Sequence, residues 1–277
     1  MGRMPRWMGA MVVCGLFANP LLAQDVFVGQ PVRPDQAVSF DAINHQLWHQ
    51  LLQQYVDQDG RVDYRGWSDN AAAVSTLNEY LNQLSHADPN TPASRHGQLA
   101  FWINAYNAVT VHGILREYPT DSIRNHTAKL VGYNIWKNLK LHVGQEAYSL
   151  DAIEHQVLRP MGEPRIHFAI VCASHSCPRL LNEAYMGERL ETQLTANTEQ
   201  FFASPVGFRY DPTARRFYVS KILDWFADDF GSNQATRLRT IAPYLPTDAA
   251  REAALANSVK VTYLPYDWSL NDQAIRR

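Results

Sequence analysis

The segment over residues 98–115 constrains the fold most, because apolar side chains occur around almost its whole circumference when it is drawn as a helix. At about 100° per residue, Leu99, Phe101, Val109 and Val111 point in four different directions. A helix that is apolar on all sides must be buried. The rest of the chain therefore has to be arranged around this helix.

Helical and strand patterns follow one another irregularly along the remaining chain. Apolar residues spaced three and four apart predict helices, and short apolar or alternating runs predict strands. The predicted helices cover residues 40–55, 77–84, 150–159, 187–202, 221–230 and 236–245. Strands are predicted over residues 165–172 and 259–264, with hairpins around Gly144 and Asp211-Pro212. We expect one α+β domain over residues 24–277, with helices packed around a small mixed sheet and a buried central helix.

The N-terminal residues have the features of a secretory signal. Two arginines precede the apolar run Met8–Ala18, which is too short to span a bilayer, and Ala23 offers a small residue for cleavage. The sequence therefore predicts a signal peptide over residues 1–23 and a periplasmic or secreted protein without a further membrane span. An uncleaved anchor is the alternative. Lipidation at Cys14 is less consistent, because large apolar residues precede it.

Composition excludes one class of partner. Hydrophobic residues make up 46% of the chain, which is enough for a sizeable core, and the net charge is −2 at pH 7. No cluster of lysine or arginine occurs, whereas nucleic-acid binding needs a basic face. We therefore expect a small-molecule or peptide ligand, no nucleic-acid partner and no cofactor.

Two cysteines bracket the loop that follows the predicted strand over residues 165–172. Removal of the signal peptide leaves only Cys172 and Cys177, and two thiols five positions apart are free to pair in an oxidising compartment. The small residues between them let backbone N–H groups approach a ligand and lower the pKa of a thiol. The pair therefore predicts either a structural disulfide or a reactive thiol.

A nucleophilic cysteine needs a base. In a strand, side chains alternate, so His167 would point away from Cys172 and lie about 16 Å from it along the chain. His175 is nearer, but it sits on the loop without an evident partner. The helix over residues 150–159 offers His155 at the margin of its apolar face. We therefore expect Cys172 as the nucleophile and His155 as its base.

Glu154 falls within the apolar face of that helix, where a carboxylate must be paired or functional. In one interpretation it forms a structural ion pair with Arg159 or Arg165. In the other it is the third catalytic residue, an orienting or charge-setting carboxylate in the same cleft.

Asn104 and Asn107 lie three residues apart on one ridge of the buried helix, with Tyr106 nearby. Buried amides must be hydrogen-bonded. They either hold the backbone of a neighbouring loop or, with Tyr106 and Cys177, contact a substrate or polarise its carbonyl group.

A zinc site is a further alternative at the cysteine loop. His167, Cys172, His175 and Cys177 occur within eleven residues. Their spacing lacks the two close ligand pairs of structural zinc motifs. The sequence therefore predicts no metal.

Several motifs together resemble one known family. They are Phe101-Trp-Ile-Asn-Ala-Tyr-Asn107, Ile153-Glu-His155, the run from Arg165 to Pro178, Asp224-Trp225 before Asp229-Phe230, and Tyr266-Asp267-Trp268. In this order they are similar to the domain-of-unknown-function family numbered 547, over about residues 40–271. The resemblance implies a secreted or envelope bacterial protein in which the cysteine loop and the asparagine-bearing helix are family features. It implies no agreed reaction.

A more distant similarity is to papain-like and transglutaminase-like hydrolases, which combine a buried helix with a sheet that carries catalytic groups. Their nucleophilic cysteine begins the buried helix, where this chain has Asn104. This similarity therefore implies chemistry that has moved or been lost.

Together these features predict a thiol-dependent hydrolase that acts by acyl transfer or amide hydrolysis. A non-enzymatic binding module, braced by a structural disulfide between Cys172 and Cys177, is the alternative from another class. A redox role is the third, because a strained short-loop disulfide is easily reduced. The spacing differs from the Cys-x-x-Cys pattern of thioredoxin-like proteins.

Overall fold

The computed structural model describes residues 25–128 and 133–275 of the 277-residue chain. The predicted signal peptide over residues 1–23, with Cys14, lies outside the described residues. Among the residues that are described, no helix combines the length and the apolar character needed to cross a membrane.

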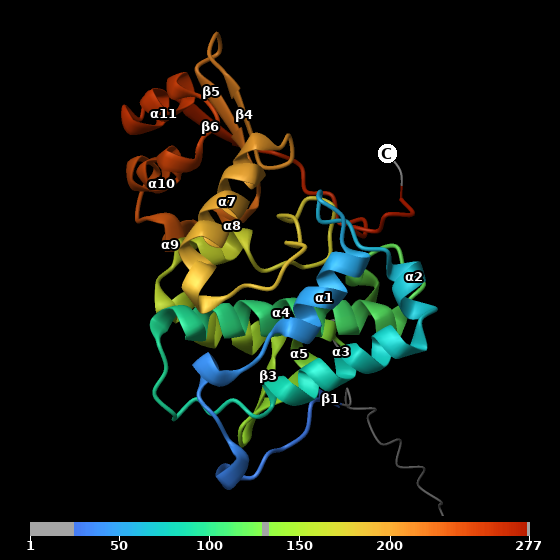
Figure 1. Cartoon of the computed structure of the whole chain (residues 1–277). Coiled ribbons are helices and arrows are strands. Elements are labelled where there is room, and N and C mark those ends of the chain that lie inside the picture. Colours follow the sequence, from blue (N-terminus) through green and yellow to red (C-terminus); the bar gives the residue numbers. More distant parts are fainter. Residues whose placement is uncertain (1–24, 129–132, 276–277) are drawn as a thin grey trace, which may run out of the picture.

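The buried helix predicted from the sequence is confirmed as α4, Arg95–Glu117. The Ser94 side chain accepts a hydrogen bond from the backbone N–H of Gly97 and so caps the first turn. Sixteen of the 23 residues are buried, so the helix is enclosed on almost every side. It crosses the middle of the molecule, and the other elements surround it (Figure 1).

The N-terminal helices cover one side of α4. They are α1 (Gln46–Tyr55), α2 (Tyr64–Ser68) and α3 (Ala71–Leu84). Trp48 stacks on Tyr80 with ring centroids 5.9 Å apart, and Tyr55 stacks on Trp67 at 4.7 Å. Large buried rings dominate core energetics, so this layer shares one hydrophobic core with α4.

A mixed three-stranded sheet packs against α4. Its order is β1 (Val26–Val28), β2 (Leu139–Val143) and β3 (Glu146–Ser149), with β1 parallel and β3 antiparallel to β2. The hairpin predicted around Gly144 is therefore confirmed. The short helix α5 (Ile135–Asn138) precedes β2, and α6 (Leu150–Ala152) follows β3 with Ser149 as its N-cap.

The C-terminal elements form a second layer with its own hydrophobic core. They are α7 (Leu190–Ala203), β4 (Phe208–Asp211), β5 (Arg216–Val219), α8 (Ile222–Trp225), α9 (Ala227–Phe230), α10 (Gln234–Ile241), α11 (Asp248–Leu255) and β6 (Lys260–Tyr263). The predicted hairpin is confirmed, and the final strand pairs parallel to β5. The α+β class is confirmed, with two small mixed sheets where the sequence predicts one.

The predicted strand over residues 165–172 is wrong. Residues Pro164–Phe168 form a 3-10 helix, and the chain then continues without regular structure into the cysteine loop. The segment is as buried as its apolar composition predicts, but no strand of the described residues pairs with it. An apolar run reports burial, and it does not distinguish a strand from a buried irregular segment.

Side-chain amides take the place of strand partners in this segment. The Asn107 amide on α4 donates to the carbonyl oxygen of Ala169 and accepts from the N–H of Val171, both at 2.9 Å. Asn197 on α7 donates to the carbonyl oxygen of Phe168 at 2.6 Å. Buried backbone groups must be paired, so these two asparagines allow irregular chain to pass through the core.

We expect Asn107→Ala to lower the free energy of unfolding by about 2–5 kcal/mol, because it leaves two buried backbone groups without partners. Chemical denaturation measures this change. The matched control is Asn78→Ala on α3, where the side chain is exposed. Equal and small effects of both substitutions would contradict the role given to Asn107.

Two histidines of the N-terminal core make stability depend on pH. Burial lowers the pKa of His45 and of His112 to about 4, whereas the unfolded value is 6.5. The unfolded chain therefore takes up these protons first as the pH falls. We expect the free energy of unfolding to be at its full value above pH 6.5 and to decrease between 6.5 and about 4, by up to about 1.4 kcal/mol per pH unit for each ring. In denaturant titrations at several pH values, His112→Leu should reduce this slope, and the exposed control His86→Gln should not.

Candidate functional site

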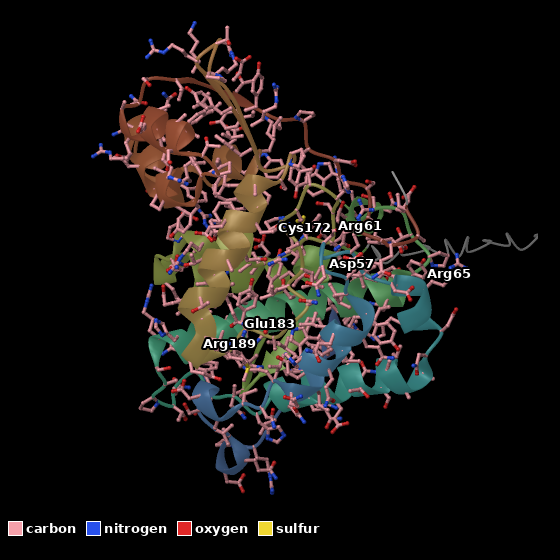
Figure 2. The ribbon with its side chains drawn as sticks, turned by 45° about the horizontal axis from the view of Figure 1, so that its top comes forward. Asp57, Arg61, Arg65, Cys172, Glu183 and Arg189 are labelled. Carbon is pink, nitrogen blue, oxygen red and sulfur yellow. The ribbon has the colours of Figure 1, made fainter. Side chains whose placement is uncertain are left out.

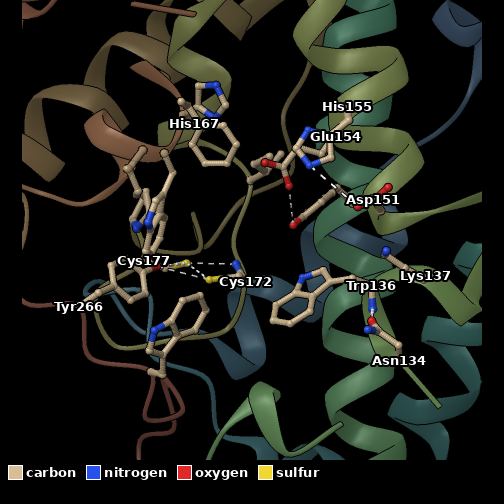
Figure 3. A pocket seen from close by; sticks show the side chains of 17 residues that line it. Asn134, Trp136, Lys137, Asp151, Glu154, His155, His167, Cys172, Cys177 and Tyr266 are labelled. Carbon is tan, nitrogen blue, oxygen red and sulfur yellow. Dashed lines mark hydrogen bonds and ion pairs between the residues drawn. The ribbon is translucent and has the colours of Figure 1, made fainter. Parts of the chain in front are cut away.

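A cavity of about 290 Å³ opens where α4, α8, the helix after β3 and the C-terminal segment meet. Six aromatic residues line it: Tyr106, Trp136, Trp225, Phe226, Tyr266 and Trp268. The lining groups that can react are Glu154, His155, His167, Cys172 and Cys177. Figure 3 shows the two cysteines and Tyr266 on one side of the cavity and Glu154 with His155 on the other. The site thus gathers residues from distant parts of the sequence.

The cysteine loop over residues 172–177 is held by the C-terminal segment. The N–H of His175 donates to the carbonyl oxygen of Ser269 at 2.7 Å, and the N–H of Asn271 donates to that of Ala173 at 3.1 Å. Ala173 has a φ of 56°, a left-handed conformation that strains a residue other than glycine. The surrounding hydrogen bonds therefore maintain a turn that the loop would not adopt alone. The loop lies between the N-terminal helices and the C-terminal elements (Figure 2).

The two thiols are in direct contact. Both cysteines are free, and their Sγ atoms lie 2.6 Å apart. Cys177 Sγ also accepts hydrogen bonds from the backbone N–H of Cys172 at 3.1 Å and from the Tyr266 hydroxyl at 3.2 Å. The Ser174 hydroxyl donates to the Tyr266 oxygen at 3.0 Å, which directs the tyrosine proton toward sulfur. Donors therefore converge on Cys177.

This convergence gives the two thiols different pKa values. Burial raises the pKa of Cys177, but hydrogen bonds from Cys172, Ser174 and Tyr266 outweigh it and lower that pKa to about 6. The hydrogen bond to Cys177, together with burial, raises the pKa of Cys172 well above its usual value. This arrangement gives Cys177 the lower pKa of the two thiols. The sequence had favoured the opposite assignment, with Cys172 as nucleophile and Cys177 in contact with substrate.

Glu154 faces the same cavity from a π-helical turn, Ile153–Leu158, that continues α6. Such turns are rare in proteins, and those that occur are often found at functional sites. The Tyr106 hydroxyl on α4 donates to Glu154 Oε2 at 3.2 Å. Burial raises the pKa of Glu154, although the charge of His155 and the bond from Tyr106 oppose the shift. The pKa of this carboxyl group in the cavity wall therefore lies above its usual value.

The arginines considered as partners of Glu154 bind other carboxylates. Arg159 donates two hydrogen bonds to the Asp229 carboxylate, at 2.6 and 2.9 Å. Arg165 pairs with Glu163 at 2.7 Å. Among the described residues, neither arginine forms an ion pair with Glu154, so the structural ion pair is absent there.

His155 lines the cavity, and its ring is exposed. Its Nδ1 lies 3.1 Å from Arg159 Nη1, and its Nε2 lies 3.9 Å from the Asp151 carboxylate. No hydrogen bond of the described residues joins it to either cysteine. The structure thus brings Cys172, His155 and Glu154 to one cavity without placing the predicted base beside the thiol.

His167 needs a correction, because the strand that would separate it from Cys172 does not exist. The ring lines the same cavity as Cys172. Its Nε2 lies 2.7 Å from Asp229 Oδ2, and it stacks on Phe226 at 4.1 Å. Burial lowers the pKa of His167 to about 4 despite the opposing effect of Asp229. In the described ranges, no group of three or more His, Cys, Asp or Glu side chains is arranged to hold a metal ion.

The side-chain amides of the two asparagines of α4 form hydrogen bonds with backbone groups. The Asn104 amide donates to the carbonyl oxygen of Tyr185 at 2.7 Å and accepts from its N–H at 2.9 Å. Asn107 holds the segment before the cysteine loop in the same two-sided way. Neither residue lines the cavity, whereas Tyr106 does. The contacts of both amides therefore correspond to the backbone-holding alternative.

Some contributors to the site were not predicted as site residues. Trp225, Asp229 and Tyr266 all reach the cavity or its histidines from the C-terminal layer. The one sequence feature that could have identified them is that they belong to the motifs that resemble the family. The hydrogen-bond partners of Asp229 and Tyr266 in the site lie 62 to 94 positions away in the sequence, so spacing alone cannot join them.

Comparison with protein families gives one match. Residues 91–202 match the model of a family described as protein of unknown function, DUF547. The match supports the family predicted from the motifs. It contains α4, Glu154 and the cysteine loop, whereas Trp225 and Tyr266 lie outside it. No curated protein and no solved structure matches the chain, so the similarity to papain-like hydrolases stays a prediction.

We expect the rate of alkylation of Cys177 by iodoacetamide to rise with pH and to reach half its maximum near pH 6. In Cys172→Ala the midpoint should move upward, because the thiolate loses a hydrogen-bond donor while it stays buried. Mass spectrometry of the alkylated peptides measures both rates. A low-pH phase that persists in Cys177→Ala would assign the thiolate to Cys172.

Proposed function

We propose that this DUF547 chain carries out thiol–disulfide exchange, with Cys177 as the attacking thiolate and Cys172 as the resolving thiol. One observation carries the proposal: three donors surround Cys177 Sγ, one of them a second thiol 2.6 Å away, at the wall of an open cavity. A purely structural cysteine pair needs neither the converging donors nor the cavity.

The exchange has two steps. The Cys177 thiolate attacks one sulfur of a substrate disulfide, which forms a mixed disulfide and releases a thiolate that takes a proton from water. Cys172 then loses its proton and attacks Cys177 Sγ, which closes the intramolecular disulfide and releases the second substrate thiol. Two electrons pass from the two protein sulfurs to the substrate disulfide; one of the two protons gained by the substrate thiols comes from water and the other is the proton lost by Cys172. An external dithiol restores the reduced protein.

The unequal pKa values suit this order of attack. Cys177 is ionised near neutral pH, so it reacts first without an added base. Cys172 stays protonated while its hydrogen bond stabilises the neighbouring thiolate. When Cys177 is consumed in the mixed disulfide, that negative charge is gone and Cys172 ionises more readily. Because both cysteines belong to one chain and their sulfurs are in contact, this second attack is intramolecular and well positioned.

Export is part of the proposal. The predicted signal peptide over residues 1–23 would deliver the chain to the periplasm or the exterior, where disulfide substrates occur. Expression of the full chain with its own N-terminus, followed by cell fractionation and N-terminal mass determination, tests this step. Recovery of uncleaved protein in the cytoplasm would contradict it.

A second candidate, the thiol-dependent hydrolase, is favoured by one observation. Glu154, with a raised pKa, faces the cavity that also holds the Cys177 thiolate. In this reaction the thiolate attacks a carbonyl carbon, Glu154 protonates the leaving amine, and water hydrolyses the thioester. Because Cys177 is already ionised, His155 is not needed as its base. Steady-state hydrolysis of an activated ester separates the candidates, since only a hydrolase releases the acyl group from Cys177 and turns over repeatedly.

A matched pair of cysteine variants tests the exchange. Reduced protein is mixed with hydroxyethyl disulfide, a small uncharged reagent, and the products are identified by mass. We expect wild type to form the intramolecular disulfide, Cys172→Ser to accumulate a mixed disulfide on Cys177, and Cys177→Ser to react only at the background rate. Accumulation in Cys177→Ser instead would reverse the roles. Failure of all three proteins to react would leave a structural pair and reject exchange.

A further inference from the structure

The cavity beside the thiol pair has an aromatic wall. Trp225 and Trp268 stack at an interplanar angle of 27° with ring centroids 5.7 Å apart. Tyr266 lies 4.8 Å from Trp225 and 4.7 Å from Trp268, and Trp136 meets Trp268 edge-on at 6.4 Å. The tyrosine of this wall is the same residue that donates to Cys177 Sγ. A ligand against the wall is therefore beside the reacting sulfur.

Trp225 extends this wall into solvent. Its exposed fraction is 46%, among few exposed large hydrophobic side chains of the described residues. Trp225 is the last residue of α8, and its side chain lines the cavity. Apolar surface left in water is unfavourable in proportion to its area, and exposed apolar surface at the rim of a pocket is a common mark of a binding site. Trp225 is thus placed to cover an apolar group that enters from outside.

The charges in the cavity argue against an anionic ligand. Among the described residues, one lysine, Lys137, and no arginine line it, while Arg124 and Arg159 lie over the rings of Trp268 and Phe226 at 5.3 and 5.4 Å. Asp151 lines it as well and offsets the charge of Lys137. Small biological disulfides that carry several carboxylates would meet one complementary group in the lining, Lys137, whereas carboxylate recognition relies on arginine and lysine. An uncharged apolar group meets the lining well.

The size of the cavity narrows the ligand further. Its volume of about 290 Å³ lies at the lower end for pockets that enclose drug-sized ligands. The space is therefore suited to a single large side chain with its adjoining backbone. It is too small to enclose a folded segment.

Resting on the proposed exchange, we infer that the substrate is a polypeptide disulfide in which an aromatic or large aliphatic side chain neighbours the cysteine. The side chain packs against the wall formed by Trp225, Tyr266 and Trp268, and the disulfide sulfur then lies against Cys177. Such side chains are buried in folded proteins, so the site prefers disulfides of unfolded or partly folded chains. The aromatic wall thereby selects substrates by their folding state.

The test compares two peptide disulfides of equal length and charge, one with tryptophan and one with glycine beside each cysteine. The reduced full-length protein is reacted with each over a range of concentrations. We expect the tryptophan peptide to reach half-saturation at about tenfold lower concentration, as the loss of one well-packed aromatic contact implies. Trp225→Ala should remove this difference, and Trp225→Phe should keep most of it. Leu255→Ala, an exposed apolar residue of α11 outside the cavity, is the matched control and should change nothing.

Each other outcome has a definite meaning. Equal half-saturation for both peptides in wild type overturns the substrate inference while the exchange stands. A neutral oligosaccharide that competes with the tryptophan peptide more strongly than free tryptophan amide also overturns it, because the aromatic wall then serves a sugar. No reaction with either peptide or with hydroxyethyl disulfide rejects the exchange and the inference together.

Discussion

The structure depends on how one buried, irregular stretch of backbone satisfies its hydrogen bonds. Residues 168–171 cross the core without a strand partner, and in such a place unpaired N–H and C=O groups are costly. The amides of Asn107 and Asn197 provide the missing partners from α4 and α7. Because an amide carries both a donor and an acceptor, Asn107 can hold the chain at two points. The cysteine loop begins where this support ends.

The candidate site follows from that support and from the C-terminal segment. Asn107 fixes the entry of the cysteine loop, and backbone bonds from residues 269–271 fix its turn. Only with both in place does the Tyr266 hydroxyl reach Cys177 Sγ. The difference in pKa between the two thiols is therefore a property of the assembled fold, since its causes come from separate segments. The loop sequence alone contains no tyrosine.

Part of this could be predicted. The all-round apolar character of residues 98–115 identified the enclosed helix, and the placement of Glu154 on an apolar face identified a carboxylate at the cavity. The apolar run at residues 165–172 misled, because regular and irregular buried backbone have the same composition. Interpreting it as a strand separated His167 from Cys172, although both line one cavity. Periodicity describes the environment of a segment and says nothing about which groups pair with its backbone.

The sequence by itself determined the α+β class, the buried helix, the family motifs and the two cysteines as the reactive pair to examine. These follow from local patterns, because burial and turn chemistry act within a few residues. Only the tertiary structure decided which thiol has the lowered pKa, that among the described residues no hydrogen bond joins His155 to a cysteine, and that Asn104 and Asn107 hold backbone. Those outcomes depend on hydrogen-bond donors and acceptors brought together from far along the chain. Electrostatic and hydrogen-bond energies fall steeply with distance in space, and distance in space is what folding sets.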